Sequence, residues 1–496
     1  MAPENFTAGP YEQSLKLPTA GEPHSLPLPL PSASSAAPSR KTTDVTDEQR
    51  VLVDRLIAHF NAPGFALPST VKALKAVWKA RDTAANGGTR SWFGGSSKKP
   101  VDNTTGASTP SSSASSATGT APAADGTRGL DEREKCFWSY EQFHRTLRAV
   151  KWQYDQAVRR AEETCVWRRE YGVEDLSAEH VAPEAETGKE VIFGYDNASR
   201  PCLYMHPYRQ NTQVSPRQIE FNVWCLERVL DLCPPTVPPT EMLCLCIDFG
   251  AAGSGGSSQP TTLGQAKKVR ISSALPTRPA ERSRTSPAQV LHILQTYYYE
   301  RLGKAVCVNV PSIFWAFYKL VGPFVDPATK EKIRFNANAR ELIPPEQLEK
   351  SCFNGELDFV YDNEQYFPAL TKLCAERKQA ALDRWRKFGN DQCGLSEVVI
   401  RGAILPESVE VARSINPYKL DVASAAATAA GGGGGGDDGT AAELETKMNG
   451  VTLNSAEADG QSAGLYRTIS PAMSEGAQSF VDAPLASPRA LDDARP

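Results

Sequence analysis

The chain has 496 residues, of which 40% are hydrophobic and 23% are charged, and its formal net charge is −4. Such a slightly acidic chain lacks the basic surface that nucleic-acid binding requires, which argues against a polyanionic partner. Its eleven cysteines show no paired Cys-x-x-Cys spacing and indicate buried reduced thiols, and the six scattered histidines offer no zinc motif, so we expect no metal site.

The N-terminal region shows no signal for secretion. The stretch "MAPENFTAGPYEQ" lacks the basic start and apolar core of a signal peptide, and no run reaches the roughly 18 apolar residues that span a bilayer. We therefore expect a soluble, cytoplasmic protein without a transmembrane segment. Residues 1–44, with "LPLPLPSASSAAPS", contain too little apolar material to fold and are predicted to be a disordered tail.

Residues 45–184 are predicted to form an N-terminal helical module. Apolar residues recur at helical spacing in "DEQRVLVDRLIAHF", and "STVKALKAVWKARD" begins at a Ser/Thr cap. A low-complexity insert, predicted to be disordered, occupies about 86–128. Beyond it, "SYEQFHRTLRAVKW" and "DQAVRRAEETCVWRREYGV" predict two amphipathic helices, the second capped by Asp155 and ended by Gly172.

Residues 185–402 show the periodicity of an α/β domain. "EVIFGYDNASRPCLYMHP" predicts a two-stranded hairpin, "SPRQIEFNVWCLERVLDL" a helix, and "EMLCLCIDF" a buried strand. After a flexible insert at about 250–286, "SPAQVLHILQTYYYERLG" predicts a helix and "KAVCVNV" another buried strand. Strands that alternate with helices indicate a largely parallel sheet.

The end of the domain is predicted to be helical. "FNGELDF" predicts a loop with a short strand, "NEQYFPALTKLCAERKQAALDRWRKF" predicts a long helix, and the core is expected to end near "LSEVVIRG". Residues 403–496 contain "GGGGGG" and many small polar residues. They are predicted to be a mostly disordered C-terminal tail.

The motifs of common enzyme classes are missing from the sequence. It contains no GxSxG, no GxxxxGK[ST] and no HExxH. "GAAGSGG" follows a strand, but it lacks the GxGxxG spacing and Ser/Pro-rich sequence follows it, which favours a flexible insert. Because no nucleophile–base pair is visible either, we predict a protein that is not an enzyme, with no catalytic residue and no cofactor.

The most apolar stretch is "PSIFWAFYKLVGPFVDPATKEKI", residues 311–333. Its helical part carries apolar side chains on two faces, whereas a surface helix normally has one apolar stripe. The pattern has two explanations. Either the helix is buried all round in the core, or its second face borders a cavity or contacts a membrane.

Polar side chains flank this apolar stretch. Glu300 ends the preceding helix, and Thr329 and Lys332 lie three residues apart on the next helix, so they share one face. A lysine and a threonine near a helix N-terminus, here capped by Asp326, can hold a phosphate by charge, hydroxyl and backbone dipole together. A solvated surface turn is the alternative explanation.

Several motifs, in order from about 130 to 402, resemble the CRAL-TRIO lipid-binding family. They are "FHRTLRAVKWQYDQAVRRAEETCVWRREYGV", "GYDNASRPCLYMHPYRQNT", "LERVLDL", "LHILQTYYYERLGKAVCVNVP" and "VGPFVDPATKEKI". They are most similar to the fungal phosphatidylinositol-transfer branch that is linked to azole drug resistance. The resemblance implies a CRAL-TRIO fold, in which a mostly parallel sheet forms the floor of an apolar lipid pocket and a gate helix closes it.

The resemblance also implies the site residues. It assigns the lipid headgroup to Glu300, Thr329 and Lys332, with Glu300 orienting Lys332. Lys151 is implied as a further headgroup residue. It belongs to an Arg-Lys pair that serves the headgroup in many members of the family; Val150 stands here in place of the arginine, which the drug-resistance branch also lacks. The gate and pocket lining is assigned to apolar side chains at the gate, namely Phe314, Phe317, Val321 and Phe324.

The function implied by the resemblance is transfer of phosphatidylinositol. Such a protein extracts one phospholipid, shields its acyl chains and exchanges it between membranes, and this branch adds a sterol as second ligand and an influence on lipid metabolism and azole tolerance. Transient peripheral contact with endoplasmic reticulum, lipid droplets or endosomes is implied as well. The alternative is a scaffold or adaptor in membrane or small-GTPase signalling that transfers no lipid.

Overall fold

The computed structural model describes residues 8–16, 18, 22–29, 45–87, 126–250, 287–311, 315, 318, 327–415 and 417–418. The predicted disorder of the two inserts and of residues 419–496 lies outside the described residues. Within them, no helix combines the length and the apolar character that crossing a bilayer would require.

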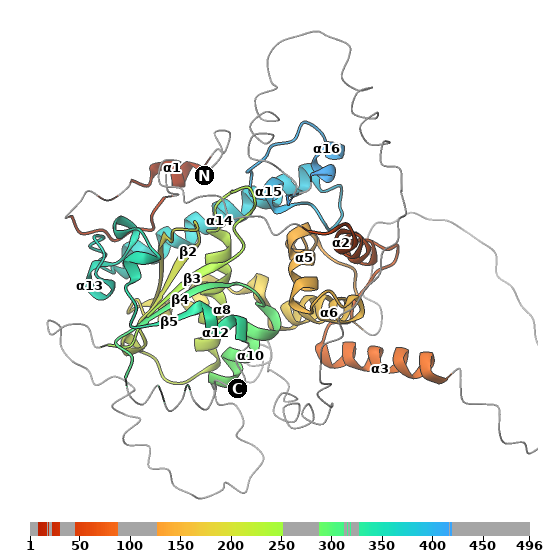
Figure 1. Ribbon diagram of the computed structural model, residues 1–496, viewed down its shortest axis with the longest axis horizontal. Coiled ribbons are helices and arrows are strands. Elements are labelled where there is room, and N and C mark those ends of the chain that lie inside the picture. The colour runs from red at the N-terminus through yellow and green to blue at the C-terminus, as the bar shows by residue number, and fades with distance from the viewer. Residues whose placement is uncertain are drawn as a thin grey trace, which may run out of the picture.

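A five-stranded sheet forms the centre of the α/β domain (Figure 1). Its order follows the chain: β1 (Glu190–Tyr195), β2 (Pro201–Met205), β3 (Leu243–Asp248), β4 (Leu302–Val308) and β5 (Ile333–Phe335). The first two strands form an antiparallel hairpin, and every later pair is parallel. The predicted hairpin and the largely parallel sheet are confirmed.

The two faces of the sheet differ in burial. Strand register places a set of apolar residues on one face: Leu203, Met205, Leu245, Ile247, Ala305, Cys307, Ile333 and Phe335. Most of them are only half-buried, whereas Cys202, Tyr204, Cys244, Cys246 and Val306 on the opposite face are fully buried in the core. The first face, which we call the apolar sheet face, is therefore the candidate floor of a lipid pocket.

Helices complete the α/β domain around and beyond the sheet. They are α7 (Ala178–Ala185), α8 (Pro216–Asp231), α10 (Pro287–Tyr297), α12 (Pro327–Lys332), α13 (Lys350–Phe353), α14 (Asn363–Phe388) and α15 (Glu397–Ile400). Helix α8 packs on β1 and β2, and α12 packs on β4. The long α14 runs from the sheet region toward the N-terminal helices (Figure 1).

The N-terminal helical module lies beside the sheet and has a core of its own (Figure 1). It consists of α2 (Asp47–Phe60), α3 (Val71–Gly87), α4 (Glu132–Phe137), α5 (Tyr140–Ala149) and α6 (Tyr154–Tyr171). Gly172 ends α6 at φ 74°, as predicted, because a left-handed position favours glycine. The predicted cap at Asp155 is wrong: Gln153 is the N-cap, and Asp155 lies in the first turn.

Disorder throughout residues 1–44 is a wrong prediction. Helix α1 (Pro10–Ser14) docks on α14, where the Tyr11 backbone N–H donates to Glu376 at 3.0 Å and Glu12 pairs with Arg377. Leu28 is 2% exposed in the main core. Helix α1 folds against α14, and His24 pairs with Phe359 just before that helix. Composition does not reveal such contacts.

Two further predictions fail at the C-terminal side. The tail was expected to begin at 403, yet α16 (Val409–Ser414) buries Ala412, and the Tyr418 hydroxyl donates to Glu241 Oε1 at 3.0 Å. In "FNGELDF" the expected strand is absent from the described residues, and two isolated bridges take its place: Leu357 pairs with Glu349 and Phe359 pairs with His24.

Candidate functional site

Strand register brings three predicted headgroup residues to one edge of the sheet. Strands β4 and β5 pair in parallel with Ala305 opposite Ile333, which places Lys332 level with Lys304 at the amino end of both strands. Glu300 lies two residues before the first residue of β4 at this same edge, and Thr329 lies one turn before Lys332 on α12. Thr329 and Lys332 are half-buried.

Glu300 also contacts the N-terminal helical module. Its carboxylate pairs with Nε of Arg148 near the end of α5, and Arg148 Nη2 lies 3.2 Å from Glu241 Oε2. Burial would lower the pKa of Arg148, but the carboxylates of Glu241 and Glu300 raise it, so the guanidinium stays charged. Glu300 therefore joins α5 to the amino edge of β4.

Lys151 lies close to this junction along the chain. It is exposed and adopts φ 54° directly after α5, and its backbone N–H donates to Arg148 O at 3.0 Å. Val150, to which the resemblance assigned the position of the family's arginine, is buried in the core of the helical module. Sequence reasoning missed Arg148, although its spacing from Arg145 on α5 already places the two arginines on one face.

The predicted gate and lining residues Phe314, Phe317, Val321 and Phe324 lie outside the described residues. Two neighbours in the same stretch are described. The rings of Trp315 and Tyr318 lie 4.9 Å and 5.2 Å from that of Phe335, measured between centroids. Trp315 and Tyr318 thus contact the apolar sheet face at β5.

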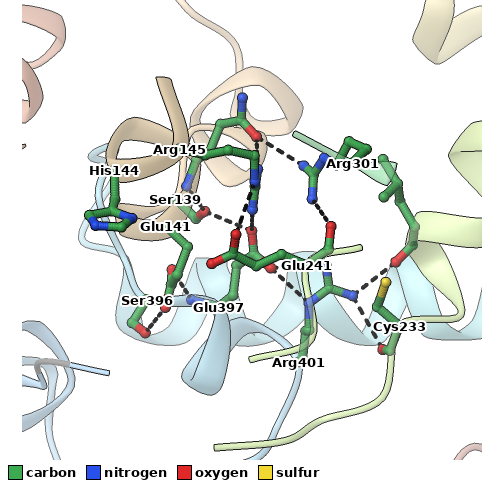
Figure 2. Close-up of polar contacts among 12 residues, drawn as sticks. Ser139, Glu141, His144, Arg145, Cys233, Glu241, Arg301, Ser396, Glu397 and Arg401 are labelled. Carbon is green, nitrogen blue, oxygen red and sulfur yellow. Dashed lines mark hydrogen bonds and ion pairs between the residues drawn. The ribbon is translucent and has the colours of Figure 1, made fainter. Parts of the chain in front are cut away.

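A buried ionic network holds this edge against the helical module (Figure 2). Arg145, which is fully buried, lies between two carboxylates: its Nε is 3.3 Å from Glu241 Oε2 and its Nη2 is 3.4 Å from Glu397 Oε1. Arg401 pairs with Glu397 at 3.0 Å, and Arg301 donates to the Glu241 carbonyl at 3.0 Å. Because Arg301 follows Glu300, the network also fixes the turn that carries Glu300.

Two carboxyl groups of this region have opposite pKa shifts. Burial, with the negative charge of Glu397, raises the pKa of Glu141 to about 8, although Glu141 accepts hydrogen bonds from Ser396 and the Glu397 backbone. Burial would also raise the pKa of Glu241, but Arg145 and Arg148 outweigh it and lower the pKa to about 2. Burial therefore favours the protonated form of Glu141, whereas the neighbouring arginines favour the charged form of Glu241.

We expect Glu141→Gln to flatten the pH dependence of stability. The pKa of Glu141 rises from 4.5 in the unfolded chain to about 8 in the folded protein, so only the unfolded state releases the proton between these values. Its contribution to the free energy of unfolding is present below pH 4.5 and falls by about 1.4 kcal/mol per pH unit up to pH 8.

Urea unfolding between pH 5 and 8 measures this effect. The free energy of unfolding of Glu141→Gln should fall less steeply with rising pH than that of the wild type. Glu186→Gln, at an exposed acid, should leave this fall unchanged. Equal slopes for Glu141→Gln and the wild type would contradict the assignment.

Comparisons with known proteins agree with this architecture. The model of the CRAL/TRIO domain family matches residues 185–270 and 281–354. A CRAL-TRIO domain-containing protein of Schizosaccharomyces pombe is 41% identical over 273 residues, which are 55% of this chain and 24% of that protein. The phosphatidylinositol transfer protein PDR17 of Saccharomyces cerevisiae is 38% identical over 282 residues, which are 55% of this chain and 74% of PDR17.

The chain belongs to the CRAL-TRIO family. It spans about a quarter of the S. pombe relative and about three quarters of PDR17. Among solved structures, the crystal structure of Sfh5 covers 40% of this chain and 65% of its own, with 17% identity and a TM-score of 0.29.

Proposed function

We propose that this protein is a phosphatidylinositol transfer protein that extracts one lipid molecule and exchanges it between membranes. The observation that carries the proposal is the half-buried apolar sheet face, whose amino edge bears Glu300, Thr329 and Lys332. The similarity to PDR17, itself a phosphatidylinositol transfer protein, supports the choice of lipid.

The apolar sheet face suits the acyl chains. Burial of each CH₂ group is worth about 0.8 kcal/mol, so a lipid leaves a bilayer readily only for a surface that is almost as apolar. Strands β3, β4 and β5 supply such a surface, and the stretch that contains Trp315 and Tyr318 reaches it at Phe335. We propose that Phe314, Phe317, Val321 and Phe324 complete the gate.

The charged edge suits the headgroup. An inositol phosphate cannot enter an apolar cavity unpaired, because burial of an uncompensated charge is very costly. We propose that Lys332 and Thr329 hold the phosphate and that Glu300 orients Lys332 and accepts hydrogen bonds from inositol hydroxyls. We propose that Lys151 adds positive charge to the headgroup site, and that Arg148 positions Glu300 through their ion pair.

The remaining assignments follow from this function. We propose that the protein acts without catalysis or cofactor, as a cytoplasmic carrier in transient contact with endoplasmic reticulum, lipid droplets or endosomes. A sterol is its proposed second ligand, with an effect on lipid metabolism and azole tolerance.

Lipid extraction tests the proposal. The full chain, purified after recombinant expression, should carry phosphatidylinositol at about one molecule per chain by mass spectrometry and should move labelled phosphatidylinositol between vesicles. A chain that carries no lipid and moves none would overturn the proposal and favour the scaffold or adaptor. Conversion of the bound lipid during incubation would contradict a non-catalytic carrier.

A further inference from the structure

Three metal-ligating side chains meet at the carboxyl edge of the sheet, opposite the proposed headgroup site. His206 directly follows β2, Glu349 directly precedes α13, and Cys352 lies within α13. Their candidate ligand atoms all lie within 4.8 Å of one another. His206 and Glu349 are each 1% exposed, and Cys352 is half-buried.

Two of these atoms are buried without a hydrogen-bond partner among the described residues. They are His206 Nε2 and Glu349 Oε2, which face each other at 3.7 Å, too far for a hydrogen bond. A buried unsatisfied polar group costs about 1–3 kcal/mol, so two at one place call for an explanation.

The other polar atoms of Glu349 and His206 have contacts of their own. The Ser351 hydroxyl donates to Glu349 Oε1 at 2.7 Å, and the Tyr208 hydroxyl lies 3.3 Å from His206 Nδ1. These contacts leave Nε2 and Oε2 directed toward each other. Second contacts of this kind orient the ligands of metal sites.

The surroundings of the cluster are rich in negative or potentially negative groups. Burial raises the pKa of Glu349 and raises that of Cys352 to about 12, and the carboxylate of Asp248 adds to both shifts. Asp248 is itself 2% exposed. Arg209 offsets part of the shift of Glu349.

We propose that His206, Glu349 and Cys352 form a binding site for a divalent transition metal, zinc above all. Nitrogen, oxygen and thiolate together are the donors that zinc accepts. Nitrogen and oxygen on one tetrahedral zinc lie roughly 3.4 Å apart, so the observed 3.7 Å needs only a small adjustment. On binding, Cys352 releases its thiol proton to solvent.

A metal bound here would link α13 to the carboxyl end of β2. Asp248 Oδ1 accepts a hydrogen bond from Asn309 at 2.8 Å, and the chain continues from Asn309 toward the apolar stretch. The sequence predicted no metal site because these ligands lie far apart along the chain and form no recognised spacing. The fold alone brings them together.

Metal titration of the full chain, stripped with a chelator, tests the proposal. We expect one Co²⁺ per chain with a thiolate-to-cobalt absorption band in the near ultraviolet, and Zn²⁺ should displace it. Cys352→Ser should remove the band, and both Cys352→Ser and His206→Gln should weaken zinc binding at least about tenfold. The control Cys136→Ser, at another half-buried cysteine, should preserve the band and the affinity.

Several results would overturn the proposal. The first is the absence of stoichiometric metal binding, and the second is equal metal affinity in Cys352→Ser and Cys136→Ser. The third is loss of metal binding in Cys244→Ser, which would assign the metal to the cluster of Cys202, Cys244 and Cys246. X-ray absorption at the zinc edge of the wild type needs no variant. One sulfur with nitrogen and oxygen neighbours is expected, and a shell without sulfur or with only sulfur would contradict the site.

Discussion

Lys332→Ala is expected to abolish phosphatidylinositol transfer while the protein stays folded. Lys332 is half-buried where α12 meets β5, so it can place a positive charge at the edge of the apolar sheet face. A hydrogen bond to a charged group is worth about 1.5–3 kcal/mol, which corresponds to a loss of at least about tenfold in lipid affinity. Transfer between vesicles should fall by at least this factor.

Lys330→Ala is the matched control for this experiment. Lys330 lies on the same short helix but is exposed, so its removal should change transfer little. Thermal unfolding of both variants shows whether the fold is intact. Equal transfer by the two variants would contradict the headgroup role of Lys332, whereas unfolding of Lys332→Ala would contradict the expectation that the fold stays intact.

Arg145→Met is expected to lower the free energy of unfolding by about 3–5 kcal/mol. Arg145 is 0% exposed and lies against the carboxylates of Glu241 and Glu397. Its removal leaves both buried carboxylates short of positive charge, although Arg148 and Arg401 still contact them. The cost of leaving a buried charge uncompensated exceeds the gain from the apolar replacement.

Arg386→Met provides the comparison at the surface. Arg386 pairs with Glu132 at 2.7 Å, and both side chains are about half exposed. Solvent screens exposed ion pairs, so this variant should unfold at nearly the same urea concentration as the wild type. Equal stability of Arg145→Met and Arg386→Met would show that the buried ionic network does not stabilise the packing of α5 and α15 beside the sheet.

Local patterns predicted most of the secondary structure for an identifiable reason. Apolar periodicity and caps act within a few residues, so α2, α6 and the β1–β2 hairpin could be recognised from the letters alone. The order of helix α1 and of Tyr418 was not predicted, because their partners, Arg377 and Glu241, lie far away along the chain. A short polar segment resembles a disordered tail until a distant surface pairs with it.

The sequence by itself determined the family, the parallel sheet and the identity of Glu300, Thr329 and Lys332 as candidate headgroup residues. Only the tertiary structure decided the partners of its charged groups. It pairs Glu300 with Arg148, buries Arg145 between two carboxylates, and turns His206 toward Glu349. The physical reason is that hydrophobic periodicity reports which side of an element is buried, whereas the pairing of buried charges depends on contacts between elements that periodicity does not encode.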